Sequence, residues 1–239
     1  MISTLLNSGY TGSELFFLII VSLFAIVLSF SVHEFDHSLA ATKLGDNTSK
    51  NMGRLTLNPL SHLDPLGTVL LLLFGFGWGK PVVYNRNNLT KLKSRKASCI
   101  IVHLSGVTGN FLLAFLCTVI YTIISFFGDM DNLIVFAVVN VLLYTSEFCY
   151  MLLAFNLLPI PPLDGYHVLE ELLPSSIKRK PGYASFIRLS PMILLALVFA
   201  GRFLSINILG LVLGAIQLPF RSIVLNVSAL IYSLLSSIF

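Results

Sequence analysis

Long apolar runs separated by short polar stretches make up most of the chain, and they predict helices of membrane-spanning length. Residues 15–32 contain no charged side chain, which approaches the ~20 apolar residues that carry a helix across a bilayer. We expect this first helix at residues 13–44, ended by Gly45 and the polar residues after it. Further apolar runs occupy residues 97–127, 133–158 and 186–239. The last run has room for two or three segments, so the pattern predicts an α-helical polytopic membrane protein with about five to six transmembrane helices.

Two short stretches between the first and second long runs have a different pattern. Residues 54–57 alternate between polar and apolar side chains before Pro59, which predicts a short strand. Residues 67–74 are apolar but too short to span, so we expect them to be re-entrant or to pack against protein. A glycine-rich turn and an extended piece follow, up to residue 84. The two extended pieces predict a small membrane-associated β-hairpin or sheet.

Composition agrees with a membrane protein. The chain has 239 residues, 56% of them hydrophobic and only 11% charged, against about 25% charged in soluble domains. We expect one integral membrane domain over 1–239, with a core at 13–170 and additional membrane helices at 186–239. The net charge of +4 is small and its basic residues lie in loops, so the expected partner is the lipid bilayer and not nucleic acid. The three cysteines lie in apolar segments without paired spacing and predict buried thiols: Cys99, Cys117 and Cys149.

Ionisable side chains gather near the end of the first apolar run. At about 100° per residue, His33 and His37 lie only about 40° apart on a helix, so both imidazoles can reach one ion. Glu34 lies beside the same face. H-E-x-x-H on a helix is typical of zinc metalloproteases, with two histidine ligands and the glutamate as general base. We therefore predict one Zn2+ per chain, whose bound water is activated by Glu34.

An alternative interpretation of this stretch is a pair of buried histidines beside a capping acid. Hydrocarbon makes every unpaired polar group costly, so a lone buried carboxylate would protonate or find a partner. We therefore favour the metal interpretation over this alternative. Asp36 lies on the same helix as the histidines, which suits a supporting role better than metal binding.

Basic residues predict the orientation in the membrane. No Lys or Arg precedes Lys43, whereas clusters lie at 86–96 and 178–180. We expect a multi-pass protein of the cell membrane with its N-terminus outside and both clusters in the cytoplasm. The first helix then runs inward, and the next two long helices run outward and inward again. The histidine pair and the stretch after residue 158 therefore meet near the cytoplasmic side.

This convergence makes Asp164 the best candidate for the third metal ligand. An ordinary Leu-Asp-Gly turn is the alternative explanation of Asp164. Other acids fit less well, because they are expected in a polar loop, near mid-membrane or on a surface helix: Asp64, Glu147, Glu170 and Glu171. Two more histidines, His62 and His103, are interpreted as local hydrogen-bonding residues, and three small or polar residues of the 97–127 helix as scaffold: Gly106, Gly109 and Asn110.

Several motifs, which follow one another along the chain in the expected order, resemble the site-2 protease family of intramembrane zinc metalloproteases. Residues 33–37 resemble its first motif, and residues 156–165 resemble the second, which supplies the third metal ligand and an upstream asparagine. Residues 53–59, 62–67 and 74–82 resemble the short bacterial-type branch without a PDZ domain. The resemblance extends over residues 13–170.

The resemblance implies a zinc metalloendopeptidase that hydrolyses peptide bonds in or next to transmembrane segments of other membrane proteins. It implies His33, His37 and Asp164 as metal ligands, Glu34 as the base, and Asn156 as the partner of the substrate carbonyl or oxyanion. Asn156 could instead satisfy backbone carbonyls that the prolines leave free. The expected hairpin next to the active site would accept an unwound substrate as an added strand at residues 54–57, or would plug the site.

Two other functions are alternatives for a membrane protein with these residues. A catalytically inactive zinc-binding scaffold would need no general base, and a metal-ion transporter would spread its ligands along a pathway.

Overall fold

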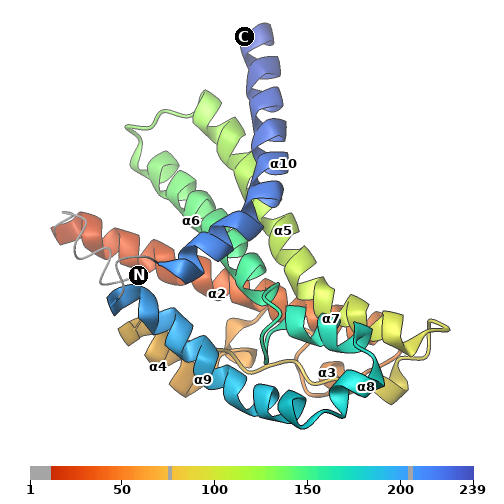
Figure 1. The fold of residues 1–239 in the computed structure, drawn as a ribbon. Helices are drawn as coiled ribbons and strands as arrows, with labels where there is room; N and C mark the ends of the chain where they lie inside the picture. The colour runs from red at the N-terminus through yellow and green to blue at the C-terminus, as the bar shows by residue number, and fades with distance from the viewer. Residues whose placement is uncertain (1–11, 75–76, 204–206) are drawn as a thin grey trace.

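The computed structural model of the chain describes residues 12–74, 77–203 and 207–239 (Figure 1). Five of the described helices are long and apolar enough to cross a membrane. These five are α2 (Gly12–Lys43), α5 (Arg95–Phe127), α6 (Leu133–Asn156), α9 (Pro181–Phe203) and α10 (Ile208–Ile238). The shorter helices are α3 (Thr48–Asn51), α4 (Pro65–Phe74), α7 (Asp164–Leu172), α8 (Ser175–Lys178), η1 (Pro59–Ser61) and η2 (Arg86–Asn88).

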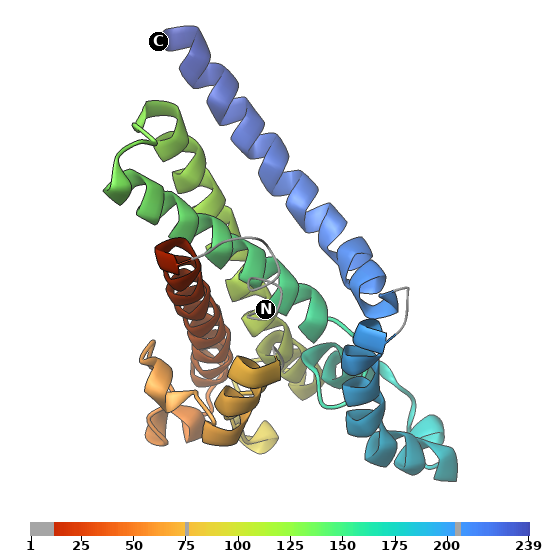
Figure 2. The same cartoon turned by 90° about the vertical axis from the view of Figure 1, so that its left-hand side faces the viewer.

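Helices α2, α5 and α6 pack against one another at the centre of the bundle (Figures 1 and 2). Small side chains allow these helices to approach closely, as is usual inside membranes. Ser29 of α2 and Cys149 of α6 meet in this way, with the thiol donating to the hydroxyl oxygen at 3.2 Å, while Ser29 donates to the Ala25 carbonyl at 2.7 Å. Cys99, Cys117 and Cys149 are buried and unpaired, as predicted.

The C-terminal run holds two helices. Helix α10 lies along α5 and α6, and Phe239, which follows its last residue, contacts Phe127 at the end of α5, with ring centroids 5.2 Å apart. At its other end, Leu209 and Leu213 pack with Leu158 and Leu163 beyond α6. Figure 2 shows that much of α10 stands apart from α2. Helix α10 therefore runs in the same direction as α5.

The predicted hairpin does not form in the part of the chain that the structure describes. The backbone groups of residues 54–57 are used locally instead, since the Arg54 N–H donates to the Ser49 carbonyl at 2.9 Å and the His62 ring bonds the Thr56 carbonyl at 2.8 Å. The second extended piece instead meets the chain after η1, through a single antiparallel bridge between Leu63 and Gly79. Residues 77–84 are thus an extended segment beside the bundle.

A buried carboxylate joins this extended segment to the end of α2. Gly45 has φ +111°, which ends α2 where a side chain would crowd Asn88. Asp46 follows and accepts from the backbone N–H and hydroxyl of Thr48, the Asn85 N–H and the Asn88 amide, at 2.6–3.1 Å. Burial alone would raise the pKa of Asp46, but these four hydrogen bonds lower it below the usual value. Asp46 therefore positions the loop that begins after Tyr84.

Candidate metal centre

Helix α2 presents its two histidines to the interior of the bundle. His33, Glu34 and His37 are all buried, and the two imidazole rings lie edge to face with centroids 4.6 Å apart. Their Nε2 atoms are 3.1 Å apart. The i, i+4 spacing thus places both nitrogens at one point, as predicted.

Asp164, the first residue of α7, lies at the same point although it is 131 positions after His33 in the sequence. Its Oδ2 lies 3.2 Å from His33 Nε2 and 3.2 Å from His37 Nε2. Gly165 permits this approach, because a Cβ there would overlap the Leu157 carbonyl. Within residues 12–74, 77–203 and 207–239, these three are the only His, Cys, Asp or Glu residues that group closely enough to hold a metal ion.

The three atoms fit a tetrahedral metal ion. Zinc bound at about 2.0–2.1 Å separates its ligand atoms by about 3.3 Å, and the three observed separations are 3.1, 3.2 and 3.2 Å. Asp164 Oδ2 is buried and makes no conventional hydrogen bond among the described residues. Two imidazoles and one carboxylate are also the ligand set of catalytic zinc sites. The site therefore fits zinc in both geometry and donor type.

Contacts from α5 hold the far side of each imidazole. His37 Nδ1 donates to the Val102 carbonyl at 2.7 Å, which leaves the Nε2 lone pair for a metal. Asn110, fully buried, has its amide nitrogen 3.3 Å from His33 Nδ1. A metal-binding His33 carries its proton on Nδ1, and rotating the amide by 180° supplies the oxygen that would accept it. The same rotation gives a partner to Asn110 Oδ1, which otherwise has none.

A glycine of α5 makes the close contact with the histidines possible. A Cβ at Gly106 would lie 2.5 Å from His37 Nε2 and 2.7 Å from His33 Cε1. One turn further, a side chain at Gly109 would collide with the carboxylate of Asp36. Gly106 and Gly109 thus let α5 cover the face of α2 that carries the metal site.

Glu34 is held by the extended segment. The backbone N–H of Val82 donates to its Oε2 at 3.1 Å. The base predicted from the sequence therefore lies between the predicted metal ligands of its own helix and a segment that is far from it in sequence.

The acids that competed with Asp164 have other partners. Asp64 caps α4 by accepting from the Gly67 N–H at 2.8 Å. Glu147 forms an ion pair with Arg221 of α10, and Glu171 forms one with Arg86 at 2.6 Å. Glu170 is placed differently again, because it accepts from the Tyr183 hydroxyl at 3.2 Å. These acids stabilise helix ends and contacts between elements.

Two predicted residues stand apart from the ligand triangle. Asn156 donates to the Leu152 carbonyl at 3.0 Å within α6, which is not one of the carbonyls that the prolines leave free. Its role toward a substrate stays a prediction. Asp36 lies against Gly109 and makes no hydrogen bond to His33 or His37 among the described residues.

Residues that sequence reasoning treated as local or structural touch the site directly. His103 Nδ1 lies 3.4 Å from Asp164 Oδ1, and Tyr84 bonds the other ring nitrogen of His103 at 2.8 Å. Burial alone would raise the pKa of Asp164, but the charge of His37 and the close ring nitrogens of His103, His33 and His37 hold it well below its usual value. The available signal was a histidine and an asparagine inside a long uncharged span, where polar groups need a reason.

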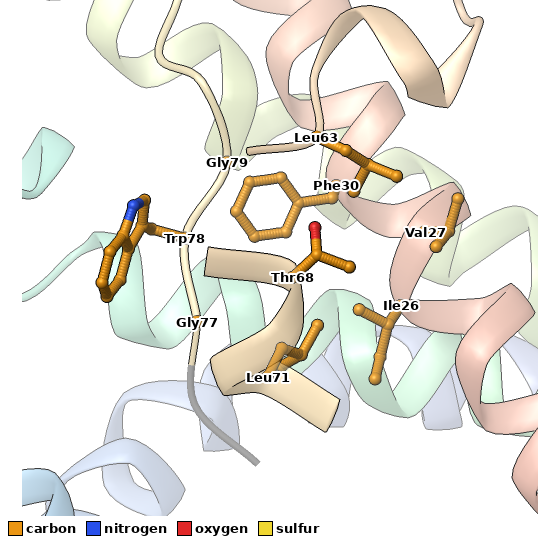
Figure 3. A pocket seen from close by; sticks show the side chains of 9 residues that line it. All are labelled: Ile26, Val27, Phe30, Leu63, Thr68, Leu71, Gly77, Trp78 and Gly79. Carbon is orange, nitrogen blue, oxygen red and sulfur yellow. The ribbon is translucent and has the colours of Figure 1, made fainter. Parts of the chain in front are cut away.

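An apolar cavity lies next to the metal site, one turn earlier on α2. Figure 3 shows Phe30 of α2 at its centre, with Thr68 and Leu71 of α4 below and the Trp78 ring turned away beyond the chain. No ionisable side chain lines it. The cavity therefore belongs to the packing of α4 against α2 and does not bind the metal.

Comparison with known proteins supplies an independent line of evidence. The family described as "Peptidase family M50" matches residues 122–201. "Putative zinc metalloprotease YwhC" of Bacillus subtilis is 38% identical over 157 residues, which are 65% of this chain and 70% of that protein. "Putative zinc metalloprotease Rip2" is 30% identical in Mycolicibacterium smegmatis and 32% identical in Mycobacterium tuberculosis, each over 158 residues that are 64% of this chain and 57% of the relative. No solved structure gives a significant match.

The helices of membrane-spanning length and the buried zinc-type site agree with the description of the relatives as putative zinc metalloproteases, and together they define a membrane zinc metalloprotease. The chain belongs to peptidase family M50, the site-2 protease family.

Proposed function

We propose that the protein hydrolyses peptide bonds in or next to transmembrane segments of other membrane proteins. His33, His37 and Asp164 hold one zinc ion, and Glu34 is the general base. The observation that carries the proposal is the triangle of two imidazole nitrogens and one carboxylate oxygen, 3.1–3.2 Å on each side, buried between helices of membrane-spanning length. The named relatives support the protease class, and the ligand and base assignments rest on this geometry.

Bound zinc supplies Lewis-acid chemistry, which activates a water molecule and polarises the carbonyl that the water attacks. Glu34 accepts a proton from the attacking water while the water oxygen bonds to the carbonyl carbon. The proton then passes from Glu34 to the leaving nitrogen as the C–N bond breaks, which restores the carboxylate. The Val82 N–H orients one Glu34 oxygen and leaves the other free for this transfer.

The substrate class follows from where the site lies. A transmembrane substrate hides its carbonyls in helical hydrogen bonds, so it must unwind before it can react, and lipid offers no replacement partners. The extended segment at residues 77–84 supports a solution, because it passes beside Glu34, is held to the chain after η1 at Gly79 and Lys80, and leaves Val83 51% exposed. We propose that the unwound substrate lies along this segment by main-chain hydrogen bonds. Residues 77–84 thus have the substrate-binding role that was predicted for residues 54–57.

Asn156 is our candidate donor to the substrate carbonyl or oxyanion. It must first leave the Leu152 carbonyl, to which it donates at 3.0 Å. Replacement by alanine should therefore lower kcat without loss of zinc, and an unchanged kcat would exclude the role.

We further propose that the protein is one integral domain of the cell membrane, with its N-terminus outside and the metal site near the cytoplasmic side. The basic loops at 86–96 and 178–180 support this orientation. Helix α10 runs parallel to α5 and begins near Leu158, so both ends of α9 lie at the metal-site end of the bundle. Phe239, at the other end of α10, then lies on the opposite side of the membrane from the metal site. A cysteine placed at Phe239 should then react with an impermeant thiol reagent from outside the cell, and labelling only from the cytoplasm would refute this topology.

Cleavage of a purified transmembrane substrate by the reconstituted enzyme tests the proposed function. The Glu34→Gln variant should bind one zinc ion and cut at least about 100-fold more slowly, because the base contributes on the order of 10²–10⁴ in rate. Glu170→Gln, a matched change on the surface of α7, should cut at the wild-type rate. Equal cutting by wild type and Glu34→Gln would refute the role of the base. Zinc-loaded wild type that never cuts would instead support an inactive scaffold, and net zinc transport would support a transporter.

A further inference from the structure

The two oxygens of the Asp164 carboxylate have different neighbours. Oδ2 faces the two ligand nitrogens at 3.2 Å each, whereas Oδ1 is 3.4 Å from Nδ1 of His103 on α5. The His103 side chain is 15% exposed and that of Asp164 is 13% exposed, so little water competes for this contact. One oxygen is therefore directed at the metal position and the other is occupied by a protein donor.

The proton positions around His103 follow from its two partners. A carboxylate only accepts, so Nδ1 must carry the proton that points at Asp164. In a neutral ring, Nε2 then accepts from the Tyr84 hydroxyl, which is 2.8 Å away. Burial raises the pKa of the Tyr84 hydroxyl above its usual value, so Tyr84 keeps the proton that it donates. Tyr84 thus selects the ring form in which His103 can donate to Asp164.

Neighbouring elements leave the His103 ring little freedom. The ring of His167 on α7 stacks on it, with centroids 4.7 Å apart and an interplanar angle of 19°. His103 follows Val102, whose carbonyl holds His37. Tyr84 belongs to the extended segment whose Val82 N–H holds Glu34. His103 and Tyr84 therefore connect the third ligand to the segment that positions the base.

We propose that His103, oriented by Tyr84, is a positioning residue that limits Asp164 to a single metal-binding oxygen. A carboxylate that binds a metal through both oxygens takes an additional coordination position, whereas a catalytic zinc site must keep one position open. The His103 hydrogen bond occupies the second oxygen and so preserves that position. This inference rests on the proposed ligand set, in which Asp164 is the third ligand.

The test uses the full-length protein loaded with Co2+ in place of Zn2+, because the visible absorption of Co2+ is stronger in four-coordinate than in five-coordinate sites. The His103→Ala variant should bind one cobalt ion with a clearly weaker band. Its zinc affinity, measured by competition with a chelator, should change by less than about 100-fold, as for other contacts behind a ligand. Tyr84→Phe removes one hydroxyl and should shift the spectrum in the same direction by a smaller amount.

Two further variants separate the hydrogen bond from simple packing. Asparagine at position 103 offers an N–H close to where Nδ1 lies, so His103→Asn should restore the wild-type spectrum in part. His167→Ala removes a ring that stacks on His103 and pairs with Glu170, so its spectrum should change less than that of His103→Ala. If His167→Ala alters the band as much as His103→Ala does, or if His103→Ala and wild type have the same spectrum, the positioning role is wrong.

The ligand set is tested separately from the role of His103. Asp164→Ala should lose most of its cobalt, and if it keeps a full equivalent the ligand assignment itself is wrong. In activity assays His103→Ala should lower kcat and leave KM within about twofold, since the residue acts on the metal site and not on substrate binding. A change confined to KM would contradict the inference.

Discussion

The metal-site end of the bundle and the C-terminal helix α10 are both apolar in sequence, yet they are built differently. In an apolar 18-residue stretch of α2, 39% of the residues are buried in the bundle, whereas in the corresponding stretch of α10 only 6% are buried. The contact between α2 and α5 depends on glycines that allow close approach and on buried polar side chains that each form a specific hydrogen bond. Most of the α10 surface is exposed, and the contacts of α10 with the bundle are mainly between apolar side chains. Close placement of polar groups, and not hydrophobicity, distinguishes the catalytic part of the molecule.

The largest effect is expected from removing the third ligand. Asp164→Ala should lower the affinity for zinc by at least about 100-fold, because loss of a ligand should exceed the 10–100-fold cost of losing a supporting contact. Zinc per chain, measured by elemental analysis after purification at limiting metal, checks this. Asp64→Ala, which removes a helix cap outside the triangle, is the control and should keep one zinc ion. Full zinc occupancy in Asp164→Ala would show that another acid is the ligand.

Matched glycine substitutions test the comparison of the two regions directly. Gly106→Ala places a methyl group 2.5 Å from His37 Nε2, so α5 must move away from α2, and we expect about 1–3 kcal/mol of destabilisation together with weakened zinc binding. Gly214→Ala on α10 meets no atom within 4 Å and should be neutral or slightly stabilising. Thermal unfolding in detergent and zinc content check both variants. Equal effects at the two positions would contradict the distinction between them.

Acid should loosen the junction after α2 through Asp46. Because its folded-state pKa is lowered, Asp46 contributes stability that is fully present above its unfolded-state pKa of about 3.9 and is lost as pH falls through the folded-state pKa. The Asp46→Asn variant should lose about 1–3 kcal/mol at pH 7, since buried donors lose their acceptor, and it should show a flatter dependence of stability on pH below 4. Protease susceptibility of the loop at 85–94 measures this. A parallel pH profile in wild type and variant would exclude Asp46 as the cause.

The smallest effect is expected at the ion pair between Glu147 and Arg221. Both side chains are partly exposed, at 56% and 32%, so replacing Arg221 by glutamine should cost no more than about 1 kcal/mol. The guanidinium also lies 4.8 Å from the centroid of the Tyr150 ring, which glutamine would not replace. Zinc content and cleavage should match wild type. Loss of zinc in this variant would mean that α10 supports the metal site after all.

The comparison also explains which predictions were accurate. Periodicity and length predicted the long helices because an apolar run in a membrane has few alternatives to a helix. The histidine pair was equally accessible, since its geometry is local to one turn. The strand at 54–57 was wrong because four alternating residues are a weak signal, and the backbone found partners in Ser49 and His62 within a few residues. The competing acids could be ranked only by expected depth in the membrane, without knowledge of their partners.

The sequence by itself determined that this chain is a polytopic membrane protein, where its long helices lie, and that His33, Glu34 and His37 share one face of the first of them. Those features depend on composition and on spacings of a few residues. Only the tertiary structure decided that Asp164 completes the triangle, that Gly106 permits α5 to cover it, and that His103, Asn110 and Tyr84 hold the groups around it. Such contacts join residues up to 131 positions apart in sequence, and no local pattern records which side chains will meet when helices pack.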